Sequence, residues 1–143
     1  MWQQLYSQLP CINEIQQARY ILVHGQPHDI QLHGFSDASE RYYGCAIYVR
    51  STNSKNHTET HLLCSKSKVA PIKKVTLPRL ELCAALLLAR LMSKVIPVLN
   101  LKISNTFYWT DSRIVSAWLA SPASRWKPFI GNRVGEIQEV SSL

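Results

Sequence analysis

The sequence has no internal repeat, no low-complexity tract and no secretory signal. Its longest apolar helical stretch, residues 80–92, is too short for a membrane span of about 20 residues and carries Glu81 and Arg90. Charged residues make up only 17% of the chain and hydrophobic residues 46%, which excludes a disordered polar chain. We therefore expect one globular domain of 143 residues with no membrane contact.

Closely spaced cysteine pairs are also absent. Cys11, Cys45, Cys64 and Cys83 stand far apart and form no C-x-x-C motif. Cys45 and Cys83 lie in apolar runs where a small hydrophobic side chain fits. We expect four reduced, buried thiols and an intracellular, cytoplasmic protein.

Acidic residues are scarce relative to basic ones. Nine Asp and Glu stand against 16 Lys and Arg, which gives a formal net charge of +7 and a pI near 9.4. A domain of this charge attracts polyanions before any specific contact forms, so nucleic acid is the first partner to consider. The alternative is that the excess charge only keeps the protein soluble.

Four apolar runs separated by polar connections predict β-strands, at residues 30–37, 44–49, 61–64 and 105–109. The first three runs are joined by links too short for the crossover that parallel neighbours need, so they should form an antiparallel meander. A helical crossover precedes the fourth run and allows it to pair in parallel with the first. The predicted fold class is α/β, with a mixed sheet and flanking helices.

The main helix is predicted from an apolar run at residues 80–92, and Pro97 is expected to mark its end. It is apolar on nearly all sides, as is typical of a helix packed deeply on a sheet. Shorter helices are predicted at 112–119 and around 129–137. The segment 65–76, which precedes the main helix, is basic and contains a proline, so we expect a surface loop there.

Three acidic residues are candidates for chemistry. Asp37 and Asp111 each follow a strand, and Glu81 stands in the first turn of the apolar helix. Each alone also fits an ordinary role, as a helix cap, a turn former or a partner of the helix dipole. The carboxyl ends of parallel strands meet at one edge of a sheet, so we expect the three to converge. Clustered carboxylates favour Mg²⁺ or Mn²⁺, and two such ions clamp a phosphodiester during hydrolysis.

Nucleic-acid contacts are expected from basic and hydroxyl side chains near these acids. The candidates are Lys66, Lys68, Lys73, Lys74, Arg79, Arg113, Ser39 and Ser112. A solvated loop is the alternative for the lysines. Trp109 and Trp118 are expected in the core rather than as stacking platforms, and Trp126 is expected to be more open.

Two other functional classes are disfavoured. The His57-Thr-Glu59-Thr-His61 segment differs from the zinc-protease helix motif, in which Glu directly follows the first His, and its threonines favour a strand. An aspartic protease needs Asp-Ser/Thr-Gly, and neither Asp37 nor Asp111 is followed by such a pair.

Three segments resemble the first three acidic motifs of the ribonuclease H domain of retroelement polyproteins. They are Phe-Ser-Asp-Ala-Ser at 35–39, Pro-Arg-Leu-Glu-Leu at 78–82 and Trp-Thr-Asp-Ser at 109–112. The match is closer still to the BEL/Pao group of LTR retrotransposons, which the segments 65–71, 77–82 and 132–134 resemble. The resemblance covers roughly residues 30 to 140.

This resemblance implies a ribonuclease H-like fold and hydrolysis of the RNA strand of an RNA–DNA hybrid. Asp37 would bridge two Mg²⁺ or Mn²⁺ ions, and Glu81 and Asp111 would complete the second metal site. An adjacent reverse transcriptase is implied as a partner. Residues 1–29 would then be a linker or the tail of the preceding connection region, and residues 30–143 the ribonuclease H-like domain.

The family's fourth acid is expected on a final helix that follows a fifth strand. Neither Glu136 nor Glu139 stands in that fourth motif, so the resemblance implies a domain incomplete at its C-terminus, with the final strand and helix missing. Activity is expected in the full-length context and impaired in these 143 residues alone. The alternative is a catalytically dead remnant or a nucleic-acid-binding module of the same fold.

Overall fold

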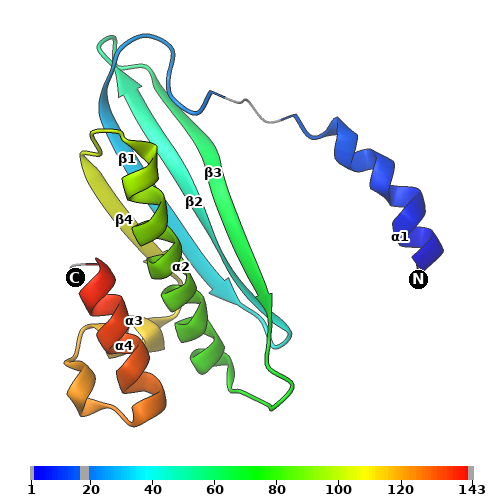
Figure 1. The fold of residues 1–143 in the computed structure, drawn as a ribbon, viewed down its shortest axis with the longest axis vertical. Helices are drawn as coiled ribbons and strands as arrows, with labels where there is room; N and C mark the ends of the chain where they lie inside the picture. The colour runs from blue at the N-terminus through cyan, green and yellow to red at the C-terminus, as the bar shows by residue number, and fades with distance from the viewer. Residues whose placement is uncertain (1, 17–19, 142–143) are drawn as a thin grey trace.

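The computed structural model describes residues 2–16 and 20–141 and contains a four-stranded sheet (Figure 1). The strands are β1 (Pro27–Ala38), β2 (Tyr42–Asn53), β3 (Thr58–Val69) and β4 (Asn105–Thr110), in the spatial order β3-β2-β1-β4. The pairs β1–β2 and β2–β3 are antiparallel, and β4 runs parallel to β1. The predicted mixed sheet, a three-strand meander with one parallel strand, is confirmed.

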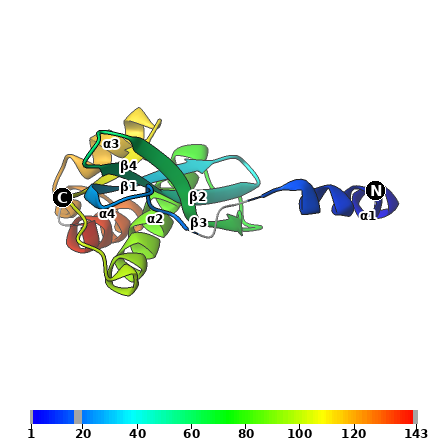
Figure 2. The same ribbon diagram turned by 90° about the horizontal axis from the view of Figure 1, so that it is seen from above.

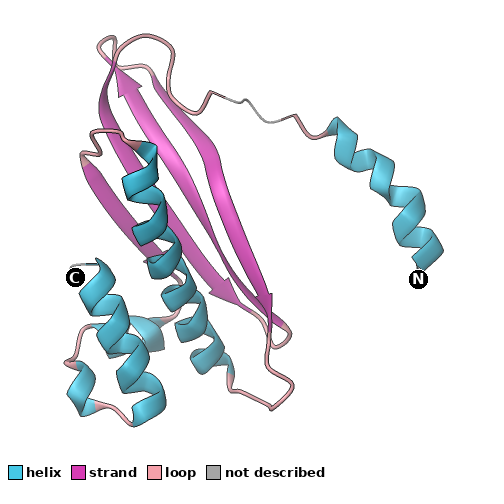
Figure 3. Cartoon of the chain, viewed as in Figure 1, coloured by secondary structure: helices cyan, strands magenta, loops and turns pink. Residues whose placement is uncertain are grey.

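The helices are α1 (Trp2–Gln8), α2 (Leu77–Leu99), α3 (Arg113–Leu119) and α4 (Pro128–Ser141), with short 3₁₀ helices η1 (Leu9–Glu14) and η2 (Ala123–Arg125). Figure 3 shows α2 lying along the sheet with α4 beside it, whereas α1 projects away from the sheet in both views (Figures 1 and 2). No residue of α1 or η1 is buried. The globular body therefore consists of the sheet, the helices that follow it and the segment just before β1, where Val23 is fully buried.

The core forms because alternate residues of β1 and β2 point to the same face of the sheet. Leu32 and Ile47 are fully buried there and pack in one cluster with Leu88 and Met92 of α2. Gly34 lies beneath that helix, and a Cβ at this position would stand 2.6 Å from Leu88 Cδ1. The missing side chain of Gly34 thus lets α2 approach β1 closely.

A second cluster covers the other side of α2. Leu82, Ala85, Leu86 and Ala89 of α2 pack there against Val115 of α3 and Val134 and Ile137 of α4. The expectation that this apolar helix is too short for a membrane span is wrong, because α2 has 23 residues and by length and composition alone could cross a membrane. Contact with the sheet on one side and with α3 and α4 on the other accounts for its apolar surface.

Two local predictions are wrong. Residues 65–69 belong to β3 rather than to a loop, because Lys66 pairs with Cys45 and Lys68 with Tyr43 across the β2–β3 ladder. Backbone pairing in a long hairpin tolerates charged side chains at the sheet edge. The helix α2 also does not end at Pro97 but continues to Leu99. A proline removes only its own N–H donor, so the last residues can still complete the turn.

The aromatic residues correct another expectation. Phe35, Phe107 and Trp109 alternate along β1 and β4 with Gly34 and Tyr108, which lie on the face that α2 covers, and all three are exposed, Trp109 by 49%. The prediction that Trp109 lies in the core is therefore wrong. Trp118 is half-buried beside the second cluster, and Trp126 is half-buried as well. Trp126 Nε1 donates a hydrogen bond to the carbonyl oxygen of Trp118 at 3.2 Å.

The four cysteines are free, but they are not all buried. Cys45 is buried in the first cluster, and Cys64 and Cys83 are partly exposed. Cys11 is exposed because η1 contributes no buried residue. Burial raises the pKa of the Cys45 and Cys64 thiols, which keeps them protonated at neutral pH.

Candidate active site

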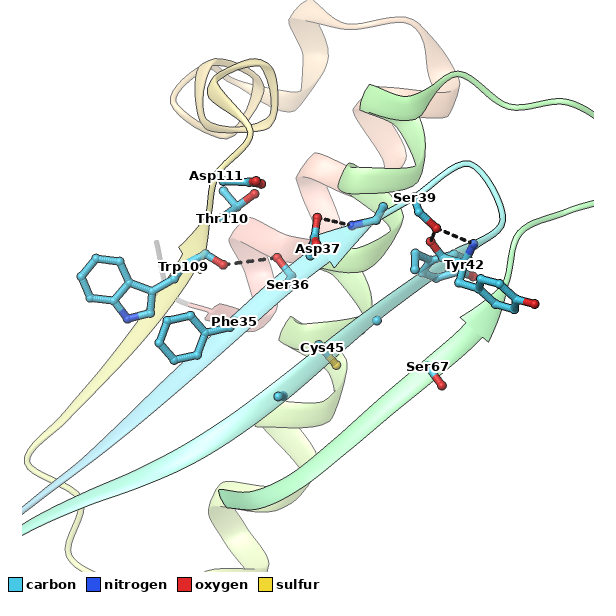
Figure 4. Close-up of a pocket in the computed structure, with 14 residues that line it drawn as sticks. Phe35, Ser36, Asp37, Ser39, Tyr42, Cys45, Ser67, Trp109, Thr110 and Asp111 are labelled. Atoms are coloured by element: carbon cyan, nitrogen blue, oxygen red, sulfur yellow. Dashed lines mark hydrogen bonds between the residues drawn. The ribbon is translucent and has the colours of Figure 1, made fainter. Parts of the chain in front are cut away.

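Asp37 and Asp111 stand together because β1 and β4 run in the same direction. Ser36 pairs with Thr110 in the parallel register, and in both segments the next residue along the chain is an aspartate. Both aspartates line one cleft of about 710 Å³, and Figure 4 shows them at the adjacent strand ends. The cleft is completed by residues of the four strands and of the β1–β2 connection: Phe35, Ser36, Ala38, Ser39, Tyr42, Tyr43, Gly44, Cys45, Ala46, Ser67, Trp109 and Thr110.

Glu81 reaches the same corner from α2. Its Oε2 atom accepts a hydrogen bond from Ser112 Oγ at 2.6 Å, and Ser112 directly follows Asp111. Ser112 is also the N-cap of α3, where its Oγ accepts the N–H of Val115 at 3.2 Å. One buried hydroxyl group therefore joins the carboxylate of α2 to the end of β4.

Two details of the predicted acid cluster change. The helix α2 begins at Leu77, so Glu81 is its fifth residue and does not lie in the first turn, where the helix dipole acts. The N-cap of α3 is Ser112 rather than Asp111. Neither Glu81 as a partner of the helix dipole nor Asp111 as a helix cap therefore fits the observed helix starts.

The surroundings of the carboxylates determine how they would bind a cation. Asp37 Oδ1 accepts the N–H of Ala38 at 2.7 Å (Figure 4), and the side chains of Asp37 and Asp111 are exposed to the cleft. Within residues 2–16 and 20–141, no group of three or more His, Cys, Asp or Glu side chains is close enough to hold a metal ion. The oxygen donors of Asp37 and Asp111 suit Mg²⁺ or Mn²⁺, whereas Glu81 is engaged with Ser112.

The predicted serine contacts fall into two environments. Ser39 lines the cleft, where its Oγ accepts the N–H of Tyr42 at 3.2 Å and donates to the Tyr42 carbonyl oxygen at 3.3 Å. Ser112 is only 7% exposed, and its hydroxyl group donates a hydrogen bond to Glu81. Ser39 is thus placed to meet a ligand, and Ser112 instead positions a carboxylate.

None of the predicted basic contacts is among the residues that line the cleft. All six are exposed: Lys66 and Lys68 on β3, Lys73 and Lys74 in the connection to α2, Arg79 in the first turn of α2, and Arg113 at the start of α3. Their distribution over several elements is suited to long-range attraction of a polyanion.

An aromatic strip beside the aspartates was missed by sequence reasoning. Phe35 and Trp109 stack at a centroid distance of 6.2 Å, and Trp109 Nε1 donates to His33 Nδ1 at 3.3 Å. Burial, followed by the positive charge of Arg50, lowers the pKa of His33, which keeps the ring neutral and able to accept this bond. The period-two alternation of β1 and β4 is the signal that would have placed these side chains on the face of Asp37 and Asp111.

Comparison with known proteins gives a family match. A family model described as the Pao retrotransposon-like RNaseH-like domain matches residues 1–112. RNase H1 from the halophilic archaeon Halobacterium salinarum NRC-1 is a similar solved structure, with a TM-score of 0.48 and 11% identity, over 78% of this chain and 77% of that chain.

A second similar structure is the N-terminal RNase H domain of a Mycobacterium tuberculosis protein, solved as a fusion with maltose binding protein. It has a TM-score of 0.45 and 12% identity, over 80% of this chain and 74% of that chain. No curated protein matches the chain.

Proposed function

The chain belongs to the family of Pao retrotransposon-like RNaseH-like domains, and from this membership we propose that it is the ribonuclease H-type endonuclease domain of a retrotransposon polyprotein. Its substrate would be the RNA strand of an RNA–DNA hybrid. The observation that carries the proposal is the shared cleft of Asp37 and Asp111, next to a third carboxylate, Glu81, that is hydrogen-bonded to Ser112. An adjacent reverse transcriptase, joined through residues 1–29, and a cytoplasmic location belong to the same proposal.

The proposed chemistry depends on divalent cations. Mg²⁺ or Mn²⁺, two ions in the complete domain, would supply a nucleophilic water and stabilise the charge that develops on the phosphate. Asp37 and Asp111 would hold the cation, and Glu81 would join them after release from Ser112. Without a cation, the exposed carboxylates would repel the phosphate of the substrate.

The protein groups around the cleft have supporting roles in this proposal. Ser39 would contact a sugar hydroxyl group, which distinguishes RNA from DNA. The exposed basic residues, Arg113 among them, would neutralise phosphates of the backbone and hold the strand across the cleft. Ser112 would hold Glu81 in place until the cation binds.

A second candidate is a nucleic-acid-binding module of the same fold without catalytic activity. It is favoured by the engagement of Glu81 with Ser112 and by the lack of a ready three-carboxylate cluster in the described part of the chain. Binding without cleavage of a hybrid would identify this alternative.

The test is cleavage of a labelled RNA–DNA hybrid in the presence of Mg²⁺ or Mn²⁺. Asp37→Asn preserves the shape of the side chain but removes its charge, so cleavage should fall to background while the fold persists. Asp29→Asn is the matched control, since Asp29 lies near the start of β1 and accepts a hydrogen bond from Gln31 at 2.8 Å. Full activity of Asp37→Asn would reject the site.

A further inference from the structure

Two arginines from different helices meet over one aromatic ring. The guanidinium carbon of Arg133 lies 3.7 Å from the centroid of the Phe129 ring, and that of Arg79 lies 5.0 Å from it. Phe129 and Arg133 are one turn apart on α4, whereas Arg79 belongs to the first turn of α2. The Phe129 ring therefore has two positively charged groups close to it where α2 and α4 meet, and such cation–π contacts are favourable.

The orientation of Arg133 is fixed by a hydrogen bond. Its Nη1 donates to the carbonyl oxygen of Phe129 at 2.8 Å, which uses one of the five N–H groups of the guanidinium. Phe129 is half-buried, so the ring is itself held in the helix packing. Arg133 is thus a pre-organised donor, for which little conformational freedom remains to be lost on binding.

Neither arginine has a carboxylate partner among the ion pairs of the described residues. Glu136, one turn beyond Arg133, is bound by both Arg90 Nε and Arg90 Nη2, the latter at 2.7 Å. The hydrogen bond from Arg90 is the main cause that lowers the pKa of Glu136, and Arg133 adds only a weaker electrostatic effect. The charges of Arg79 and Arg133 are therefore not neutralised by an ion pair with another described residue.

We propose that Arg79 and Arg133, held over Phe129, form a clamp that binds phosphates of a nucleic-acid backbone beside the carboxylate cleft. Guanidinium groups recognise phosphate through pairs of parallel hydrogen bonds, and a bound anion would offset the repulsion between the two nearby positive charges. Arg79 precedes Glu81 by two residues, which places the clamp at the end of α2 that carries the proposed active site. The identity of the ligand as nucleic acid rests on the proposed function.

The test measures binding separately from cleavage. Fluorescence anisotropy with a short labelled RNA–DNA hybrid in EDTA, over a range of salt concentrations, reports affinity and the number of phosphates neutralised. Arg133→Gln and Arg79→Gln should each weaken binding by about eightfold at 0.1 M salt, because one lost phosphate contact makes the slope of log K against log salt shallower by about 0.9. Lys94→Gln, which removes an exposed charge about four turns along α2, is the matched control.

Two further variants separate a clamp from a structural contact. Arg133→Lys keeps the charge but loses the planar fork, so the salt slope should remain that of the wild type while the affinity falls. Phe129→Leu keeps both arginines and should also weaken binding, since they lose their shared support. Thermal unfolding of each variant identifies any loss of fold, in which case the comparison rests on Arg133→Lys.

The outcomes distinguish this inference from the proposed function. The clamp is overturned if both glutamine variants match Lys94→Gln in affinity and slope, or if the wild type binds neither the hybrid nor a DNA duplex. Loss of cleavage in Asp37→Asn together with unchanged binding in the arginine variants would leave the nuclease proposal standing without the clamp. Weakened binding in the arginine variants together with full cleavage by Asp37→Asn would support the clamp and reject the proposed active site.

Discussion

The hydrogen bond between Ser112 and Glu81 makes a sharp prediction, because one hydroxyl group both caps α3 and holds the carboxylate of α2. Replacing Ser112 by Ala removes both bonds. Loss of an N-cap costs about 1 kcal/mol. A hydrogen bond to a charged group contributes about 1.5–3 kcal/mol, and we reduce this to about 1 kcal/mol because Glu81 is only partly buried.

The expected destabilisation by Ser112→Ala is thus about 2 kcal/mol, and at this chain length each kcal/mol lowers Tm by roughly 3–5 °C. Ser112→Gly separates the two contributions, since glycine retains most of the capping preference but cannot bond Glu81. It should cost about half as much as Ser112→Ala. Urea unfolding measures the free energies, and thermal unfolding gives the Tm values.

A double-mutant cycle with Glu81→Ala isolates the pair. The coupling energy between Ser112→Ala and Glu81→Ala should be about 1 kcal/mol, because the two side chains share one hydrogen bond. Strict additivity of the two changes would refute the contact.

Two further predictions concern the helix α4. Gly131→Ala should destabilise the fold by about 1–3 kcal/mol, because the new Cβ would stand 2.8 Å from the carbonyl oxygen of Ala123. Gly135→Ala is the contrast: its Cβ would meet only the Ala123 Cβ, at 3.4 Å, so the fold should gain up to about 1 kcal/mol from helix propensity. Urea unfolding measures both changes in free energy. The Arg90 contact lowers the pKa of Glu136 from its ordinary value of 4.5, so this ion pair stabilises the fold above that pH and is lost as the pH falls through the lowered pKa. The stability difference between the wild type and Glu136→Gln should therefore shrink on acidification from about pH 6 to pH 3, and a constant difference would contradict the pairing.

Much of the sheet was predictable because strand patterns and short links constrain topology. The antiparallel meander follows from connections too short for a crossover, and the parallel strand from the helix that precedes it. That parallel pairing also accounts for the predicted meeting of Asp37 and Asp111 in one cleft. The lengths of the elements were less predictable, since β3 and α2 extend through residues whose local preferences oppose strand and helix.

The predicted site was less complete. The sequence placed Glu81 near the aspartates but could not show that Ser112 binds it, because that contact joins residues 31 positions apart. The catalytic and metal-binding roles of Asp37, Glu81 and Asp111 remain predictions, as do the substrate contacts of the serines and basic residues.

The sequence by itself determined which residues share a face and which acids follow strands, because these properties depend on local periodicity and chain order. Only the tertiary structure decided which face is covered: Tyr108 packs partly buried against the first cluster, whereas its neighbour Trp109, expected in the core, is 49% exposed. The same holds for the arginine pair. Arg79 and Arg133 lie near the Phe129 ring because α2 and α4 pack side by side (Figure 1), and no local pattern encodes the partner of a helix face.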